Sequence, residues 1–247
     1  MLVLLPPSET KAPGGDGHAL DLDTLFAPEL TPVRDKLLDA VVELAADVPA
    51  SLAVLGISER QAAEVERNAE LRTAPTLPAI TRYTGVLYDA LDVVSFTKAE
   101  RARADSRLAV ASALFGVVGA GCRIPAYRLS GGSVLPSVGP LGTWWRPALE
   151  PVLASVDGLV VDLRSGAYAN LAKVPGAVTV RVLTENAAGK RTVVSHHNKS
   201  HKGRLARALA VARTEPSNAA GVLKIAQAAG MRVEQAGERA LDVIVSG

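Results

Sequence analysis

The chain has 247 residues, 48% of them hydrophobic and 21% charged, with a formal net charge of +2 at pH 7. This composition supports a sizeable buried core and excludes wholesale disorder, and the near balance of charge means that any site for nucleic acid or phosphate must be a local concentration of cations. The single cysteine, Cys122, excludes an internal disulfide and a cysteine-based zinc site.

The N-terminal segment predicts a buried strand followed by a polar loop. Leu2–Leu5 is continuously apolar and ends at two prolines, which is typical of a strand buried on both faces. The opening residues match neither a signal peptide nor a membrane span, so we expect a soluble, cytoplasmic protein with no membrane partner. The next residues include Glu9 and Lys11, and α/β proteins place ligand-contacting groups at such positions. The alternative is a helix cap with a solvated lysine.

The following segment predicts helices. Helical periodicity runs over residues 32–47, and a helix pair is predicted around 50–68. Gly56 and Ser58 lie in the turn between the paired helices, and Ser58 with Gln61 has the spacing of a capping box. This pattern indicates a helix–hairpin–helix within about residues 49–68, whose turn would offer backbone N–H groups to a DNA phosphate. The alternative is an ordinary pair of packed helices.

Residues 107–129 pass from an apolar, glycine-containing run into the sequence RIPAYRL. The proline step favours an extended chain, in which alternation places Arg123 and Tyr127 on one face and Arg128 on the other. Two guanidinium groups near a phenol suit carboxylate or phosphate oxygens. The alternative is a core strand whose arginines cap neighbouring carbonyl groups.

The remaining elements alternate between helix and strand. Helices are expected at residues 98–104, 145–153, 199–213 and 217–229, and strands at 158–163, 177–184, 192–196, 232–234 and 241–245. The second and third of these strands predict an antiparallel hairpin. With no repeat and no clear linker, the sequence predicts one compact domain over residues 1–247, of mixed α/β class, in which helices surround parallel and antiparallel strands.

Residues 195–213 form a basic segment that contains no acid. In a helix, Lys199 and Lys202 share a face, as do Arg204 and Arg207, and such a cationic face attracts phosphates. The alternative is a solvated surface helix. His197 and His201 stand four residues apart, but no third ligand accompanies them, so we expect no metal site.

Six sequence blocks then occur in order across nearly the whole chain: LVLLPPSETK, RYTGVLYDAL, SALFGVV with RIPAYRL, GTWWRPAL, VVDLRSGAY and HNKSHKGRLAR. This succession resembles the YaaA family of bacterial peroxide-stress proteins. The resemblance implies hydroperoxide defence, limitation of iron-dependent oxidative damage, a helix–hairpin–helix and a basic cleft that binds duplex DNA regardless of sequence. By position, the hairpin maps to Gly56 and Ser58. The cleft maps to Arg82, Arg123, Tyr127, Arg128, Lys199, Lys202 and Arg204.

The chain departs from the family pattern at its first loop. Many members carry Ser-Pro-Ala-Lys-Thr there, whereas Glu9 occupies the lysine position here and Lys11 comes two residues later. Polar residues from Asp162 to Tyr168 end and follow the predicted strand at residues 158–163. If this strand lies beside Leu2–Leu5, the loops that follow the two strands would meet. A second hypothesis is therefore an enzyme acting on a small anionic or nucleobase-containing ligand in a cleft lined by Glu9, Arg123 and Asp162, with Glu9 or Asp162 as its acid–base group. No phosphate-binding or dinucleotide motif is present, and no cofactor is expected.

Overall fold

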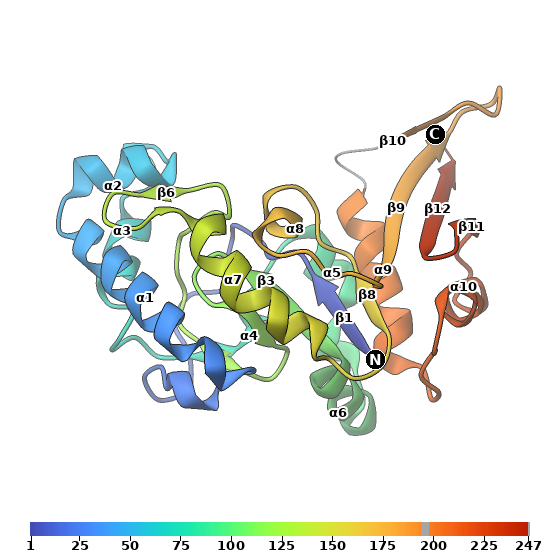
Figure 1. Cartoon of the computed structure of the whole chain (residues 1–247), viewed down its shortest axis with the longest axis horizontal. Helices are drawn as coiled ribbons and strands as arrows, with labels where there is room; N and C mark the ends of the chain where they lie inside the picture. The colour runs from blue at the N-terminus through green and yellow to red at the C-terminus, as the bar shows by residue number, and fades with distance from the viewer. Residues whose placement is uncertain (194–197, 247) are drawn as a thin grey trace.

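A computed structural model describes residues 1–193 and 198–246. The strands of its main sheet are β1 (Leu2–Leu5), β3 (Leu108–Ser112), β4 (Gly116–Gly119), β8 (Val160–Asp162), β9 (Val178–Glu185), β10 (Arg191–Val193), β11 (Val233–Gly237) and β12 (Ala240–Ser246). Their order in space is β11-β12-β9-β8-β1-β3-β4, with β10 also paired to β9 (Figure 1). Two small sheets pair β2 (Leu77–Pro78) with β5 (Arg123–Ile124), and β6 (Val134–Leu135) with β7 (Gly139–Pro140).

Strand β1 lies in the interior of the main sheet. It runs parallel to β3, with Val3 opposite Leu108, and parallel to β8, with Leu2 opposite Val160. A strand with parallel neighbours on both sides is covered on both faces, which explains its uninterrupted apolar sequence. The predicted hairpin is confirmed by the antiparallel pair β9–β10 as far as Val193. The rest of that predicted strand, residues 194–196, lies outside the described residues.

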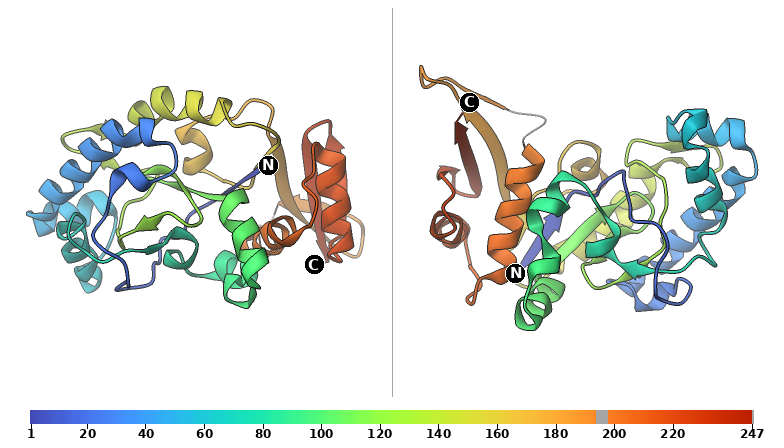
Figure 2. Two further views of the ribbon diagram at one scale, coloured as in Figure 1. Left: turned by 90° about the horizontal axis from the view of Figure 1, so that it is seen from below. Right: turned by 180° about the vertical axis from the view of Figure 1, so that it is seen from behind.

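Helices cover both faces of the sheet. They are α1 (Thr31–Ala45), α2 (Val48–Leu55), α3 (Ala63–Ala69), α4 (Ala79–Arg82), α5 (Val86–Leu91), α6 (Lys98–Arg107), α7 (Leu141–Ala154), α8 (Ala167–Leu171), α9 (Asn198–Val211) and α10 (Ala219–Ala228). Figure 2 shows α7 on one face and α5, α6 and α9 on the other, while α1–α3 and α10 lie toward opposite ends of the long axis. The mixed α/β class is therefore confirmed. Within the described residues, no helix is both long and apolar enough to cross a bilayer.

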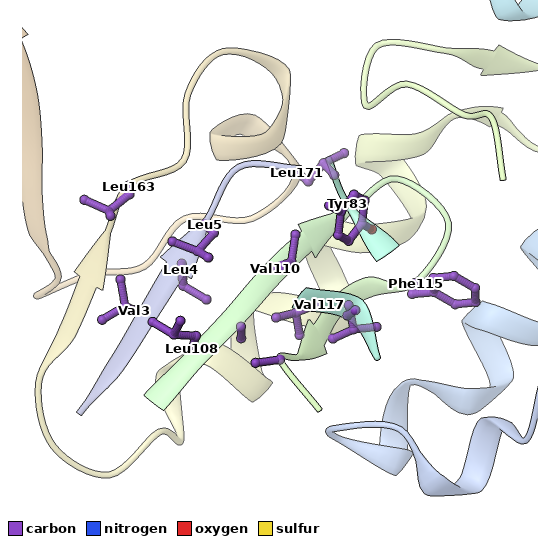
Figure 3. Close-up of a cluster of buried hydrophobic side chains, with 14 of the residues drawn as sticks. Val3, Leu4, Leu5, Tyr83, Leu108, Val110, Phe115, Val117, Leu163 and Leu171 are labelled. Atoms are coloured by element: carbon purple, nitrogen blue, oxygen red, sulfur yellow. The ribbon is translucent and has the colours of Figure 1, made fainter. Parts of the chain in front are cut away.

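The hydrophobic core is built on the central strands (Figure 3). Val3, Leu5 and Val110 are fully buried there, and the indole of Trp145 from α7 packs against Gly116. Gly116 has φ +72° and leaves no room for a Cβ beside that ring. The turn into β4 therefore requires glycine at this position.

The predicted helix pair around residues 50–68 corresponds to α2 and α3. Gly56 ends α2 in a left-handed conformation with φ +63°, and Ser58 with Gln61 forms the predicted capping box at a short 3-10 turn, Glu59–Gln61. These features confirm two helices joined by a glycine turn. They do not define a helix–hairpin–helix, and that assignment stays a prediction.

Candidate anion-binding site

The loops that follow β1 and β8 lie side by side, as the sequence predicted, because the two strands are parallel neighbours. The chain leaves β1 for β3 on one side and later returns to β8 on the other side. This reversal of strand order is the position at which open α/β sheets place their ligands. Residues 10–12 of the first loop also bond to residues 82–84, which brings Lys11 opposite Tyr83.

Lys11 is partly buried over aromatic rings. Its Nζ lies 4.1 Å from the centre of the Tyr127 ring and 5.3 Å from that of Tyr83. It donates to the carbonyl oxygens of Ser8 at 3.1 Å and Glu9 at 3.4 Å. Burial lowers the pKa of Lys11 to about 8, although the Glu9 carboxylate acts in the opposite direction. The amine can therefore exchange a proton near neutral pH.

Glu9 and Arg128 form a loose ion pair beside Lys11. Nη2 of Arg128 lies 3.5 Å from Oε2 of Glu9, and the two side chains are 17% and 40% exposed. Within the described part of the chain, Glu9 Oε2 and Arg128 Nε are buried atoms without a hydrogen-bond partner. Buried polar atoms are rarely left unsatisfied, so these two point to a ligand or water that completes the arrangement.

Arg128 is positioned by Asn68, a buried residue of α3. The backbone N–H of Arg128 donates to Oδ1 of Asn68 at 2.8 Å, and Nδ2 of Asn68 donates back to the Arg128 carbonyl at 2.8 Å. These reciprocal bonds fix the backbone from which the guanidinium extends. Nothing in the local sequence signals this contact, because the two residues are 60 positions apart.

A chain of buried hydroxyl groups lies beneath Lys11. The hydroxyl of Tyr127 is 2.7 Å from that of Tyr83 and 2.7 Å from that of Ser112. Tyr88 adds a stacked ring and donates to the Pro6 carbonyl at 3.0 Å. Burial raises the pKa of all three tyrosines above the usual value, so their phenol groups stay neutral.

Tyr168 of α8 closes another side of the site. Its ring packs against Gly131, where a Cβ would lie only 3.1 Å from the ring. Burial and the nearby Glu9 charge raise the pKa of Tyr168 to about 12. The phenol therefore stays protonated and can donate a hydrogen bond at physiological pH.

Asp162, the second predicted acid–base residue, is fully engaged. The Arg164 guanidinium donates two hydrogen bonds to its carboxylate, of 2.9 and 2.8 Å. The side chain of Asp162 is only 13% exposed and that of Arg164 only 2%. Lys202 reaches the same loop from α9 and donates to the carbonyls of Leu163 at 2.8 Å and Arg164 at 3.3 Å. Burial lowers the pKa of Lys202. These three side chains shape the loop after β8 and are not open to a ligand.

The predicted anion-binding residue Arg82 bonds to backbone carbonyl groups instead. Arg82 is buried and donates to the carbonyls of Ile124, Gly14, Pro75 and Ala12. This matches the alternative in which arginines cap carbonyl groups, and it removes Arg82 from the accessible surface.

Arg123 does not share a face with Tyr127 as the alternation predicted. It is an ion-pair partner of Asp16, whereas Tyr127 lies under Lys11 and Arg128 lies beside Glu9. Strand β5 ends at Ile124, so the alternation of a strand does not continue through Pro125.

The cations of α9 also have separate roles. Lys202 is buried, and Arg207 donates to the carbonyls of Leu91 and Asp92, whereas Lys199 and Arg204 remain exposed. The exposed turn at Gly56 lies toward the opposite end of the molecule from α9 (Figure 1).

The predicted histidine pair cannot be placed in full, since His197 lies outside the described residues. Among residues 1–193 and 198–246, no group of three or more His, Cys, Asp or Glu side chains is arranged to hold a metal ion.

The fold and this site define a mixed α/β protein whose polar side chains converge at the switch point of its sheet. The sequence profile of the family described as peroxide stress protein YaaA matches residues 1–236, and the chain belongs to this family. It is 53% identical over 240 residues to a UPF0246 protein of Corynebacterium efficiens, with 95% of each chain covered. It is also 46% identical over 239 residues to a UPF0246 protein of Streptomyces coelicolor, with 95% of this chain and 92% of the relative covered.

Proposed function

We propose that this YaaA-family protein binds a small anionic substrate at the Lys11 site and acts on it in the cytoplasm during peroxide stress. The Lys11 site is defined here as Glu9, Lys11, Arg128 and Tyr168. The observation that carries the proposal is the loose Glu9–Arg128 ion pair, whose buried Oε2 and Nε atoms have no hydrogen-bond partner within the described residues. An incoming anion satisfies the guanidinium and separates the two side chains.

The four side chains divide the chemistry between them. Arg128 supplies a planar set of N–H donors for a carboxylate or phosphate group, and Lys11 supplies a second cation that can also lose its proton. Glu9 is the carboxylate that exchanges a proton with the bound molecule once Arg128 turns to the anion. Tyr168 donates a hydrogen bond. The Glu9 carboxylate beside the cations Lys11 and Arg128 distinguishes this site from a purely cationic surface that only attracts phosphates.

Calorimetric titration with inorganic phosphate and with adenosine monophosphate tests this proposal. Arg128→Met should weaken binding by at least tenfold, because a charge-assisted hydrogen bond to the anion is lost. The matched control is Arg60→Met, which removes an exposed arginine near α2. If neither anion binds the wild-type protein, or if both variants bind equally well, the proposed site is wrong.

A second proposed activity is sequence-independent binding of duplex DNA, through which the protein limits iron-dependent oxidative damage. It is favoured by the exposure of Lys199 and Arg204 on α9, a helix without acidic residues. The turn between α2 and α3, which holds Gly56 and Ser58, lies apart from α9 along the long axis of the molecule (Figure 1). We therefore assign the DNA contact to α9 alone.

Fluorescence anisotropy with a labelled duplex tests the DNA proposal. Lys199→Glu/Arg204→Glu should abolish binding, while the charge-matched control Lys190→Glu/Lys224→Glu, at two exposed lysines elsewhere, should retain most of it. Binding should weaken with salt, since released counterions drive it. Absence of binding at low salt, or an equal loss in both double variants, would contradict a specific role for α9.

A further inference from the structure

A groove of about 520 Å³ lies between α9, the turn after α10 and the end of β12. It lies where the pairing of β11 with β12 ends, at Val243, and just beyond this point the N–H of Ile244 donates to the Arg232 carbonyl at 2.8 Å. Helix α9 forms one wall, and the turn at residues 229–232 forms another. Its volume is in the range of pockets that hold small organic molecules.

The charged side chains that line this groove are all cationic among the described residues. Arg204, Arg207 and Arg232 line it together with His201, and none of its lining residues is acidic. Arg207 is already bonded to the Asp92 carbonyl, and Arg232 is paired with Glu185. Arg204 is exposed and makes no ion pair with any described residue. Of the three guanidinium groups at the groove, that of Arg204 is therefore the one without an ion-pair partner among residues 1–193 and 198–246.

The rest of the lining is largely apolar. Ala208 and Val211 contribute from α9, Met231 from the turn and Val245 from β12. A ligand that fills this space must bury an apolar body next to a single cationic group. A polyphosphate would leave charges unmatched there, and an uncharged apolar molecule would leave Arg204 without a partner.

We propose that the groove binds a small organic monoanion with an apolar body, of the class of medium-chain carboxylates, with its carboxylate on Arg204. This binding site is separate from the Lys11 site. Lys202, on the same helix, points to the loop after β8, whereas Arg204 faces the groove. The inference does not depend on the proposed anionic substrate or on DNA binding.

Isothermal titration with decanoate below its micellar concentration tests the groove. Decanoate should bind the wild-type protein, and Arg204→Gln should weaken that binding by about tenfold or more, because it removes the charge-assisted contact to the carboxylate. Arg60→Gln, an exposed arginine distant from the groove, is the matched control and should bind like the wild type. Ala208→Leu should weaken binding too, by filling the groove from α9.

Three results separate this groove from other sites. Arg128→Met, which disables the Lys11 site, should retain the decanoate binding that Arg204→Gln weakens. Decanol, which has the same chain without the charge, should bind at least tenfold more weakly than decanoate. Undetectable decanoate binding, equal binding by wild type and Arg204→Gln, or loss of binding in Arg128→Met would overturn the proposal.

Discussion

Lys11 illustrates how a single residue acquires chemistry from its surroundings. Its amine lies over the rings of Tyr83 and Tyr127 and donates hydrogen bonds to the carbonyls of Ser8 and Glu9. The sequence predicted a ligand-contacting lysine in the loop after β1, because polar residues directly follow a buried strand. It could not predict the depressed pKa, which depends on Tyr83 and Tyr127 from segments far away in the chain.

The depressed pKa of Lys11 predicts a pH dependence of stability. Between about pH 8 and 10.5 the unfolded chain binds the proton of Lys11 more tightly than the folded protein does, so the free energy of unfolding rises with pH. Relative to Lys11→Met, which lacks this titration, wild type should gain up to about 3 kcal/mol over that interval. Urea unfolding of both proteins at several pH values measures the difference. A difference that stays constant would show an ordinary surface lysine.

Asn68 shows how much of the site depends on a residue that no motif marks. Its two hydrogen bonds hold the Arg128 backbone, so we expect Asn68→Ala to weaken phosphate binding several-fold and to destabilise the fold by about 1–3 kcal/mol. Ser51→Ala is the matched control, since Ser51 is also buried and donates a 2.7 Å bond to the Leu44 carbonyl away from the site. Calorimetry should show an affinity loss in the first variant only; equal losses would mean that Asn68 has no positioning role.

At the scale of elements, the strands and long helices were predictable and the small elements were not. The apolar run of β1, the alternation of β9 and the capping box of α6 each carry a local signal that the structure confirms. The short helices α4 and α5 and the two-stranded sheets have too few residues for a periodic pattern. The run at residues 107–129 divides into β3, β4 and β5, with turns at residues 113–115 and 120–121 between them.

Helix α9 packs closely against α5, and this contact depends on Gly203. A Cβ at Gly203 would overlap the Leu87 carbonyl oxygen and press on Ala90 at 2.9 Å. Gly203→Ala should therefore cost about 1–3 kcal/mol in the free energy of unfolding. Gly142→Ala, in α7 with nothing within 4 Å of the added Cβ, should change stability by no more than about 0.5 kcal/mol. Chemical unfolding of the two variants tests this, and similar values would exclude a tight α5–α9 contact.

The basic segment of α9 shows where charge patterns mislead. Its sequence predicted that Lys199 and Lys202 share a cationic face, but Lys202 is buried against the loop after β8 while Lys199 is exposed. Arg204 and Arg207 do share a face, and both line the groove. Periodicity places residues on a helix face, yet it does not reveal which face is covered by a neighbouring element. The surrounding layers of the fold decide that.

At the scale of the whole molecule, one connected core joins both ends of the chain. Buried side chains from Leu2 to Val243 belong to a single cluster. We therefore expect residues 1–247 to unfold as one domain, as the sequence predicted. Scanning calorimetry should give one transition whose calorimetric and van't Hoff enthalpies agree. Two separate transitions would show two domains.

The central claim is that an anion binds between Lys11 and Arg128. The most direct measurement is the pH titration of the Lys11 ¹³Cε resonance, assigned with Lys11→Arg, in the absence and presence of saturating phosphate. A bound anion stabilises the protonated amine, so the pKa of Lys11 should rise from about 8 by one unit or more. An unchanged titration in phosphate would contradict the claim.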